Sequence, residues 1–279
     1  MAQTVNEDGS VSNTTATQTT NEDGSYTSES TTTNQDGSSS TTNSIGNADG
    51  SSETHGTSYD ANGDPTDAFN NEIDTSGNSS TQTIEYEDGE PVVSGYTIDT
   101  SENPEGEKEI RDGVNTEYYA FDTTRGFVVH IEFEVDMSNK PPGQNENHHN
   151  ILTAKRATPS PWYGFQLRQS NTTKNIICGT QFATGSNTNT NIMPSVTTGN
   201  WGYYDLTITY DPTLARNQFT CYDNYGQRTI LTKTGTFPDI DELKYLKMTL
   251  GCALDADGNP YRFANLNVFD FSVQRLPSA

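Results

Sequence analysis

A short Asx–Gly motif recurs along the first 90 residues and restricts the fold of this region more than any other feature. It reads NEDGS twice, then NQDGS and NADGS, and then the looser DANGDP, DTSGNS and YEDGEP. The glycines, spaced by 15, 13, 13, 13, 14 and 12 residues, are Gly9, Gly24, Gly37, Gly50, Gly63, Gly77 and Gly89. Asx–Gly steps supply the positive φ angles of tight hairpin turns, and the Thr-rich segments between them favour extended backbone. We therefore expect each unit to be one strand and one turn of a repetitive β structure.

The repeats contain too little apolar surface to form an interior of their own. Ordering a unit of ~13 residues costs on the order of 13–26 kcal/mol of backbone entropy, whereas burying one Val, Ile or Tyr returns ~1.5–3 kcal/mol. Two states are compatible with this deficit: a disordered segment, or a shaft ordered by Thr/Ser hydrogen-bond ladders between stacked or intertwined chains. We expect a homo-oligomeric shaft of three copies, because a flexible linker would not need the same turn residues at regular spacing.

The composition of the chain changes near residue 100. Residues 1–100 contain 18 Asp or Glu and no Lys or Arg, whereas residues 101–279 contain 20 acidic and 15 basic residues. The first leucine is Leu152 and the first tryptophan is Trp162, so apolar residues also concentrate in the second part. We predict a repeat stalk over residues 1–90, a connector over 91–105 and one globular domain over 106–279.

The formal net charge of −23 restricts the classes of partner. An acidic surface repels phosphate backbones and anionic lipid head groups, so we expect neither nucleic acid nor a membrane as a partner, whereas a neutral glycan is compatible. The opening MAQTVNEDGS lacks the basic and apolar runs of a signal peptide, and no stretch reaches the ~20 apolar residues of a membrane span. We expect synthesis and assembly in a cytoplasm.

Residues 106–279 alternate between apolar and polar positions, which is typical of β-strands with one buried face. Between residues 129 and 137 the odd positions are apolar, and the even positions are His130, Glu132, Glu134 and Asp136. Similar runs predict strands over 151–156, 163–169, 176–180, 204–210, 218–222, 245–254 and 266–276, with one short helix over 240–244. Eight or more antiparallel strands in this length predict a jelly-roll β-sandwich, so the whole chain is expected to be all-β.

Four sequence runs in this domain follow the strand order of a known fold. They are GFVVHIEFEVDM, then ILTAKR with YGFQLR, then WGYYDLTITYD followed by NQFTCYDNYGQ, and finally NLNVFDFSVQRL. In strand pattern, over residues 106–279, they resemble concanavalin A-like (laminin-G-like) lectin domains. Joined to a repeat stalk, the arrangement also resembles tail-fibre or head-appendage proteins of bacteriophages. These resemblances imply a structural virion subunit, made in the host cytoplasm and released by lysis, that contacts other virion proteins and attaches to host-surface or mucus glycans.

The candidate ligand site surrounds one turn-and-strand pair and consists of His148, His149, Trp162, Tyr163 and Arg168. An aromatic platform with a few orienting polar groups is a common way to hold a sugar. Trp162 follows two prolines and so begins a strand at a loop mouth, although packing in the core is the competing interpretation. For the two histidines the competing interpretation is a surface turn. We expect Trp201 to pack in the core.

Glu132, Glu134 and Asp136 are the enzymatic alternative, because they share one strand face. They resemble the arrangement of family 16 glycoside hydrolases, in which Glu, Asp and Glu alternate on one strand and carboxylates ~5–5.5 Å apart act as nucleophile and general acid. The order here is Glu-Phe-Glu-Val-Asp, so the shorter Asp136 would replace the acid/base. Alternating carboxylates also solvate the outer face of an ordinary strand. We therefore predict a non-catalytic protein, with a polysaccharide-degrading glycoside hydrolase or a bacterial surface adhesin as alternatives.

No cofactor is predicted. Calcium is the usual metal of lectins of this kind, but the only local cue lies at residues 254–260, where the glycine comes too early for an EF-hand loop and a hairpin turn is expected. Cys178, Cys221 and Cys252 are odd in number and widely spaced, which favours reduced core thiols over a disulfide framework or zinc site. Cys252 alternates in step with neighbouring apolar residues, so we expect it to be buried on one strand face.

Overall fold

The computed structural model describes residues 2–5, 10–87, 89–100, 108–110, 118–122, 126–136, 148–155, 164–170, 175–182, 184–185, 188–212, 218–236, 245–254 and 260–276. All regular elements in these ranges are β-strands, which confirms the all-β prediction. The chain divides into two compact units, residues 1–106 (unit 1) and residues 107–279 (unit 2). Within the described ranges, no helix is long and apolar enough to cross a membrane.

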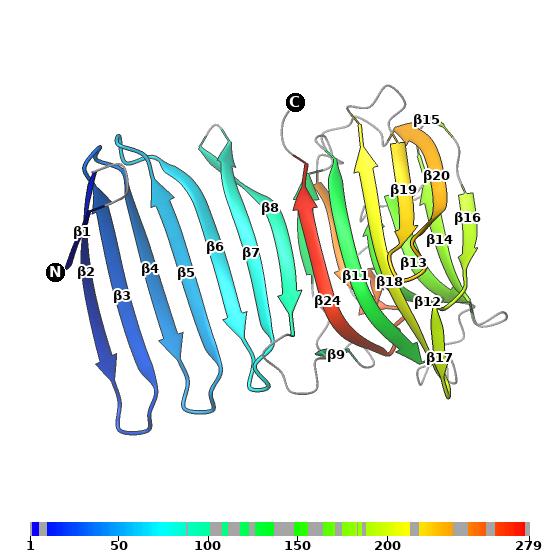
Figure 1. Ribbon diagram of the computed structural model, residues 1–279, viewed down its shortest axis with the longest axis horizontal. Coiled ribbons are helices and arrows are strands. Elements are labelled where there is room, and N and C mark those ends of the chain that lie inside the picture. The colour runs from blue at the N-terminus through cyan, green and yellow to red at the C-terminus, as the bar shows by residue number, and fades with distance from the viewer. Residues whose placement is uncertain are drawn as a thin grey trace. The chain divides into compact units, whose positions relative to one another are not determined.

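Unit 1 is an antiparallel meander in which each strand pairs with the next along the chain (Figure 1). Its strands are β1 (Ala2–Val5), β2 (Val11–Thr20), β3 (Tyr26–Asn34), β4 (Ser39–Gly46), β5 (Ser52–Tyr59), β6 (Pro65–Ile73), β7 (Ser79–Glu87) and β8 (Glu90–Asp99). The motifs from Gly24 to Gly89 lie in the connections between successive strands, where each of these glycines has a positive φ. The repeat period is therefore the length of one strand plus its turn.

The turn at residues 21–25 shows how the motif closes a hairpin. The Gly24 amide donates to the Asn21 carbonyl oxygen at 3.1 Å, and the Asn21 amide donates to the Ser25 carbonyl oxygen at 2.8 Å. Gly24 has a φ of 89°, the conformation that a type I turn with a glycine bulge requires. Asp23 Oδ1 accepts hydrogen bonds from Oγ and N of Ser25 at 2.7 and 3.0 Å, and these bonds lower the pKa of Asp23. The same contacts recur at residues 34–38 and 47–51, so these carboxylates stabilise their own turns.

Polar pairs join strands β2 to β6 of unit 1 in place of an apolar core. Hydroxyl pairs connect Thr14 with Thr32 at 2.9 Å and Thr54 with Ser44 at 3.0 Å. Two aromatic rings cover glycines directly opposite them on the neighbouring strand: Tyr26 lies over Gly46, and Phe69 lies over Gly56. Thr/Ser pairs were predicted between stacked or intertwined chains, whereas these pairs join strands of one chain, and pairing between chains remains a prediction.

Unit 2 is a sandwich of two antiparallel sheets. The first sheet has the order β24–β11–β18–β19–β20–β15, with β9 paired to β24 and β17 paired to β18. Its strands are β9 (Lys108–Ile110), β11 (Phe127–Asp136), β15 (Thr184–Gly185), β17 (Val196–Thr198), β18 (Trp201–Asp211), β19 (Gln218–Asp223), β20 (Arg228–Thr236) and β24 (Leu266–Arg275). The second sheet consists of β10 (Tyr118–Asp122), β21 (Tyr245–Leu250), β12 (His148–Lys155), β13 (Gly164–Ser170), β14 (Ile176–Gln181) and β16 (Thr188–Ile192), in that order. A separate hairpin is formed by β22 (Ala253–Leu254) and β23 (Pro260–Tyr261).

The core of unit 2 lies between the two sheets. Residues of β11 alternate between buried and half-buried along the whole strand, as the sequence predicted. Phe127 of β11 and Phe219 of β19 both contact Phe165 of β13, with ring centroids 5.5 Å apart in each pair. The two sheets are therefore joined through aromatic side chains, and the opposite face of β11 is left to polar residues.

Two local predictions are corrected by the structure. The strand predicted over 245–254 is interrupted, because Gly251 takes a φ of 77° between β21 and β22. Cys252 is buried as predicted, but it lies in this bend and not in a strand. Trp201 is half-buried and not in the core, because the core face of β18 is formed by the alternate positions beginning at Gly202. The helix predicted over 240–244 lies outside the described residues.

Candidate functional site

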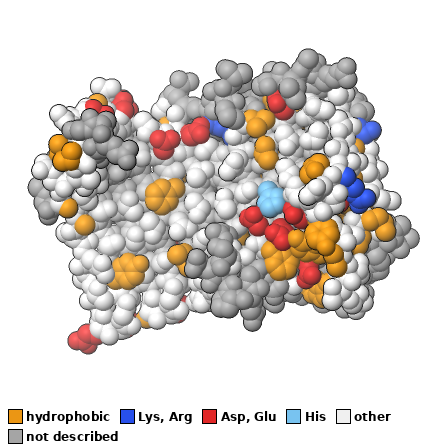
Figure 2. Space-filling view, viewed as in Figure 1, with side chains coloured by type: hydrophobic (Ala, Val, Ile, Leu, Met, Phe, Trp, Pro, Cys, Tyr) orange, Lys and Arg blue, Asp and Glu red, His pale blue; other side chains and the backbone are white. Residues whose placement is uncertain are grey.

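The outer face of β11 carries most of the candidate chemistry. His130, Glu132 and Glu134 are half-buried and alternate with core residues, so they point away from the sandwich interior. Glu132 lies opposite Asp205 of β18 on one side and Asp270 of β24 on the other. Figure 2 shows acidic and hydrophobic side chains gathered beside a histidine on this unit. The three strands thus bring together residues that are far apart in the sequence.

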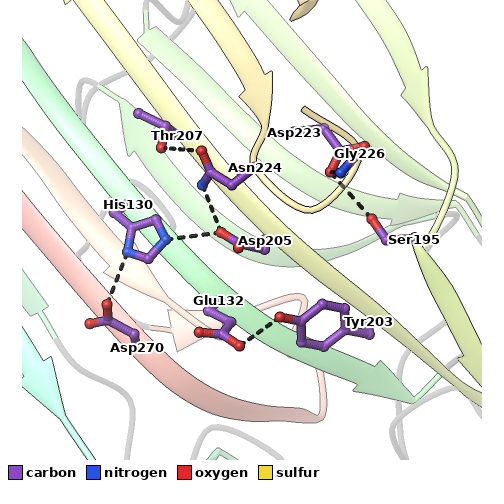
Figure 3. Close-up of polar contacts among 10 residues, drawn as sticks. All are labelled: His130, Glu132, Ser195, Tyr203, Asp205, Thr207, Asp223, Asn224, Gly226 and Asp270. Carbon is purple, nitrogen blue, oxygen red and sulfur yellow. Dashed lines mark hydrogen bonds and ion pairs between the residues drawn. The ribbon is translucent and has the colours of Figure 1, made fainter. Parts of the chain in front are cut away.

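His130 bridges two carboxylates on neighbouring strands (Figure 3). Its Nδ1 lies 3.0 Å from Asp270 Oδ2, and its Nε2 lies 2.9 Å from Asp205 Oδ1. The hydrogen bond to Asp270, and then the one to Asp205, raise the pKa of His130 to about 9 against the opposing effect of burial. The imidazole is therefore protonated at neutral pH and donates to both carboxylates. This charged bridge links β24, β11 and β18.

Tyr203 and Glu132 form the second polar contact of this face. The Tyr203 hydroxyl donates to Glu132 Oε1 at 2.6 Å. Burial, followed by the contact with Glu132, raises the pKa of Tyr203, so the hydroxyl keeps its proton and remains the donor. Glu134 lies directly across from Tyr203 in the pairing of β11 with β18. Tyr203 thus pairs across the sheet with Glu134, while its hydroxyl binds Glu132.

Aromatic side chains border the acidic residues. The Tyr203 ring contacts Tyr225 edge-on, with centroids 5.8 Å apart, and lies 6.2 Å from the Phe269 ring. Tyr225 is 59% exposed and belongs to the turn between β19 and β20. Phe269 occupies a β-bulge opposite Glu132 and Phe133, and both it and the following Asp270 are half-buried. The bulge therefore adds an aromatic ring beside an acidic residue on this face.

Polar contacts fix the turn that carries Tyr225. Asn224 Nδ2 donates to Asp205 Oδ1 at 2.6 Å, and Thr207 Oγ1 donates to Asn224 Oδ1 at 3.1 Å. Asp223 accepts three more hydrogen bonds, from Gly226 N at 2.9 Å, Ser195 Oγ at 3.3 Å and Arg228 Nε at 3.1 Å. The turn is thus tied to the same Asp205 that binds His130 (Figure 3), and this turn carries the exposed Tyr225.

The ligand residues predicted from the sequence lie on the other sheet or outside the described residues. The structure does not describe Trp162, Tyr163 or the side chain of His148. His149 is 1% exposed and its Nδ1 lies 3.0 Å from the Phe263 carbonyl oxygen, so the surface-turn interpretation of the two histidines is wrong: β12 begins at His148.

Among the predicted ligand residues, Arg168 has a side chain that is partly accessible to solvent. It is half-buried in β13 and donates from Nη2 to Asn189 Oδ1 at 3.2 Å. Burial, and then the charge of Arg262, lower the pKa of Arg168. A ligand-binding role for the predicted set remains a prediction.

Sequence reasoning missed Tyr203, Asp205, Tyr225, Phe269 and Asp270. Tyr203 and Asp205 occupy ordinary outer-face positions of an alternating strand, and Tyr225 lies in a turn. The alternation reveals the face on which a residue lies, but only strand order and register reveal its neighbours across the sheet. A search for acidic and aromatic residues on the outer faces of all long predicted strands would have found most of this group.

The described residues contain no group of three or more His, Cys, Asp or Glu that could hold a metal ion. The predicted hairpin near residues 254–260 is supported by the pairing of Leu254 with Pro260, and residues 255–259 lie outside the described part of the chain.

Unit 1 carries a groove of about 580 Å³. The Phe69 ring and Gly56 are part of its lining, which also includes the hydroxyls of Ser40, Thr42, Ser58 and Thr83. The groove offers an aromatic ring and hydrogen-bonding groups, which suits a polar ligand.

No protein-family model matches the sequence, and no curated protein is significantly similar to it. Among solved structures, a fructofuranosidase from Schwanniomyces occidentalis complexed with fructose matches 96% of this chain and 60% of its own, with 9% identity and a TM-score of 0.38. A mutant of NanB sialidase from Streptococcus pneumoniae matches 62% of this chain and 26% of its own, with 14% identity and a TM-score of 0.39. A NanB complex with Optactamide matches 57% and 25%, with 15% identity and a TM-score of 0.37. The chain spans 60% or less of each matched protein.

These matched structures are enzymes whose names refer to sugars, and none of the three is a fibre protein. The prediction of a non-catalytic protein is therefore wrong by this comparison. With identities of 9–15% and TM-scores of 0.37–0.39, the likeness carries no further argument about this chain, so the argument for a function below starts from the chain's own residues.

Proposed function

We propose that unit 2 is a carbohydrate-active domain that binds a neutral polysaccharide on the outer face of β24, β11 and β18 and hydrolyses a glycosidic bond there. The observation that carries this proposal is the pair of carboxylates Glu132 and Glu134 on one strand face, with the Tyr203 hydroxyl 2.6 Å from Glu132. Exposed Tyr225, in contact with the Tyr203 ring, extends this face with an aromatic surface.

Hydrolysis requires two carboxyl groups placed about the scissile bond. Alternate residues of a strand are separated by about 6.8 Å along the chain. The carboxyl groups of Glu132 and Glu134 are therefore compatible with the ~5–5.5 Å of a retaining enzyme or the ~6.5–9.5 Å of an inverting one. Glu132 Oε1 accepts the hydrogen bond of the Tyr203 hydroxyl, which orients this carboxyl group, so we assign Glu132 as the nucleophile or base and Glu134 as the proton donor.

The surroundings of these carboxylates suit an uncharged sugar. Sugar rings present C–H faces that pack on aromatic side chains, and the ring centroids of Tyr225 and Phe269 lie 5.8 and 6.2 Å from that of Tyr203. Asp205 and Asp270 add acceptors for hydroxyl groups, and their charge is only partly offset by His130. A sialic or uronic acid would bring its own negative charge to this acidic face, which is unfavourable.

Release of reducing ends from a panel of neutral polysaccharides tests the proposal. We expect Glu132→Gln in the full chain to lower the rate by about 10²–10⁴-fold, because the amide cannot act as nucleophile or base. Glu72→Gln, the same substitution at an exposed strand position of unit 1, is the matched control and is expected to retain the activity. No release by the wild-type protein, or equal rates for wild type and Glu132→Gln, would contradict the proposal.

For unit 1 we propose a second role, as the shaft of a homo-oligomeric virion fibre or appendage that presents unit 2 to host-surface or mucus glycans. The regular hairpins, with turn contacts repeated at residues 21–25, 34–38 and 47–51, support a rigid spacer. The expected partners are further copies of the chain, with three as the expected number, and other virion proteins, and the expected location is the virion after host lysis. Sedimentation equilibrium of the full chain tests the assembly, since a monomer at all concentrations would contradict it.

A further inference from the structure

Two of the three cysteines face each other across the interior of unit 2. Cys178 lies in β14 of one sheet and Cys221 lies in β19 of the other. Both are 0% exposed, and both occupy core-facing positions of their strands. The Cys221 side chain is also the first cause of the raised pKa of Cys178, in agreement with this placement. The sandwich therefore holds two thiols together that are far apart in sequence.

Neighbouring contacts independently place these two strands against each other. The rings of Phe165 in β13 and Phe219 in β19 have centroids 5.5 Å apart. Cys221 follows Phe219 by two residues on the same strand face, and Cys178 pairs directly with Leu167, which follows Phe165 by two residues. One step along β19 from Phe219 thus leads to Cys221, and one step along β13 from Phe165 leads to Leu167, the cross-strand neighbour of Cys178.

We propose that Cys178 and Cys221 are the site of an inter-sheet disulfide, which forms when the protein meets a low-molecular-weight disulfide such as oxidised glutathione. One protein thiolate attacks the oxidant, which gives a mixed disulfide and releases one glutathione thiol. The second protein thiolate then displaces the other glutathione thiol. The two cysteines lose two protons and two electrons, and one oxidised glutathione becomes two reduced molecules.

Burial determines when this reaction takes place. The hydrogen bond to Cys221, together with burial, raises the pKa of the Cys178 thiol, which keeps it protonated and unreactive in the folded protein. Oxidation therefore requires the chain to be still folding, or unit 2 to open locally. In a reducing compartment the thiols remain reduced, and in an oxidising environment the bond forms and persists.

The bond would also anchor the turn that carries Tyr225. Cys221 belongs to β19, the strand that leads into this turn, and the turn is tied to Asp205 through Asn224. A covalent link from Cys221 to β14 would restrict the movement of β19 relative to the second sheet. This consequence rests on the proposed function of the outer face, whereas the disulfide itself does not.

Refolding of the full chain with oxidised and reduced glutathione tests the proposal. Mass spectrometry of the denatured protein is expected to show a loss of about 2 Da and one reactive thiol in place of three. Proteolysis without reduction is expected to give a linked peptide that contains Cys178 and Cys221. Because the bond closes a loop of about 40 residues, the midpoint of thermal unfolding of unit 2 should rise by roughly 5–10 °C.

Two variants separate this disulfide from other thiol chemistry. Cys252→Ala removes the remaining buried cysteine and is expected to keep both the mass loss and the thermal shift. Cys178→Ala is expected to abolish both. Three reactive thiols in the refolded wild type, or a linked peptide that contains Cys252, would overturn the proposal. The peptide map of the unreduced wild type tests the disulfide even if Cys178→Ala does not fold. If the disulfide does not form but the polysaccharide is still hydrolysed, only the disulfide proposal fails. If the disulfide forms but no polysaccharide is hydrolysed, only the proposed function fails.

Discussion

Unit 1 and unit 2 are both antiparallel β structures, but different interactions specify their strand pairing. Along β2 to β6 of unit 1 the only buried residues are Ser12, Gly46 and Gly56, so register there is set by turn geometry and polar cross-strand pairs. In unit 2 the register is set by the need to bury one face of each long strand, as in β11 and β18. The comparison shows that regular turn chemistry can order strands whose side chains contribute little hydrophobic stabilisation.

The largest effect is expected from removal of a core ring in unit 2. Phe127→Ala would leave a cavity beside Phe165 and Tyr210 and should lower the free energy of unfolding by about 3–5 kcal/mol. Val128→Ala, the next residue on the outer face, is the matched control and should cost less than ~1 kcal/mol. Urea denaturation followed by fluorescence measures both. Equal losses would remove the distinction between the core and outer faces of β11.

A smaller effect, on the order of 2–3 kcal/mol, is expected from the His130 bridge in unit 2. Its folded-state pKa of about 9 exceeds the ordinary histidine pKa of 6.5, so the stabilisation is fully present below pH 6.5 and is lost as the pH rises through about 9. His130→Gln should flatten the decline in unfolding free energy between pH 6 and pH 10. Urea denaturation of wild type and variant at both pH values is the measurement. Parallel pH dependences would show that the bridge to Asp205 and Asp270 does not form.

The smallest of the three effects concerns glycine packing in unit 1. A Cβ at Gly46 would collide with the Tyr26 ring, so Gly46→Ala should destabilise the pairing of β3 with β4 by about 1–3 kcal/mol. Adding Tyr26→Ala should relieve the collision. Gly50→Ala has open space but a φ of 93°, so it should cost about 1–2 kcal/mol and show no relief from Tyr26→Ala. Hydrogen exchange of the β3 and β4 amides reports each change, and a missing rescue at Gly46 would refute the packing argument.

The hairpins of unit 1 were predictable because their turn signal is local. Residues 21–25 contain every group needed for the turn, including the glycine at positive φ and the carboxylate of Asp23. The alternating faces of β11 were also predictable, since a period of two follows from strand geometry alone. Strand β20 was missed because its sequence, RTILTKTGT, gives no sustained alternation of apolar and polar residues.

The site was less predictable than the fold, because it depends on which strands become neighbours. Glu132 was identified from its strand, but its partner Tyr203 is 71 residues away and Asp270 lies further still. Nothing local to Asp205 or Asp270 indicates that both bind one imidazole. The extra residue in the bulge that exposes Phe269 is likewise visible only when β24 is paired with β11. Prediction of such a site requires the sheet order as well as the pattern of each strand.

The stability of unit 1 should depend on ionic strength, because each of its turns carries carboxylates. Successive hairpin connections alternate between the two ends of the meander, so Asp23 and Asp49 lie at the same end, two strand spacings or about 9.6 Å apart. This separation is close to the Debye length of about 8 Å at physiological ionic strength, where mutual repulsion is largely screened. In dilute buffer, near 0.01 M, the Debye length grows to about 30 Å and the carboxylates at one end repel one another as a group. Physiological salt is therefore expected to favour the intact meander, and its removal is expected to destabilise the turns at both ends.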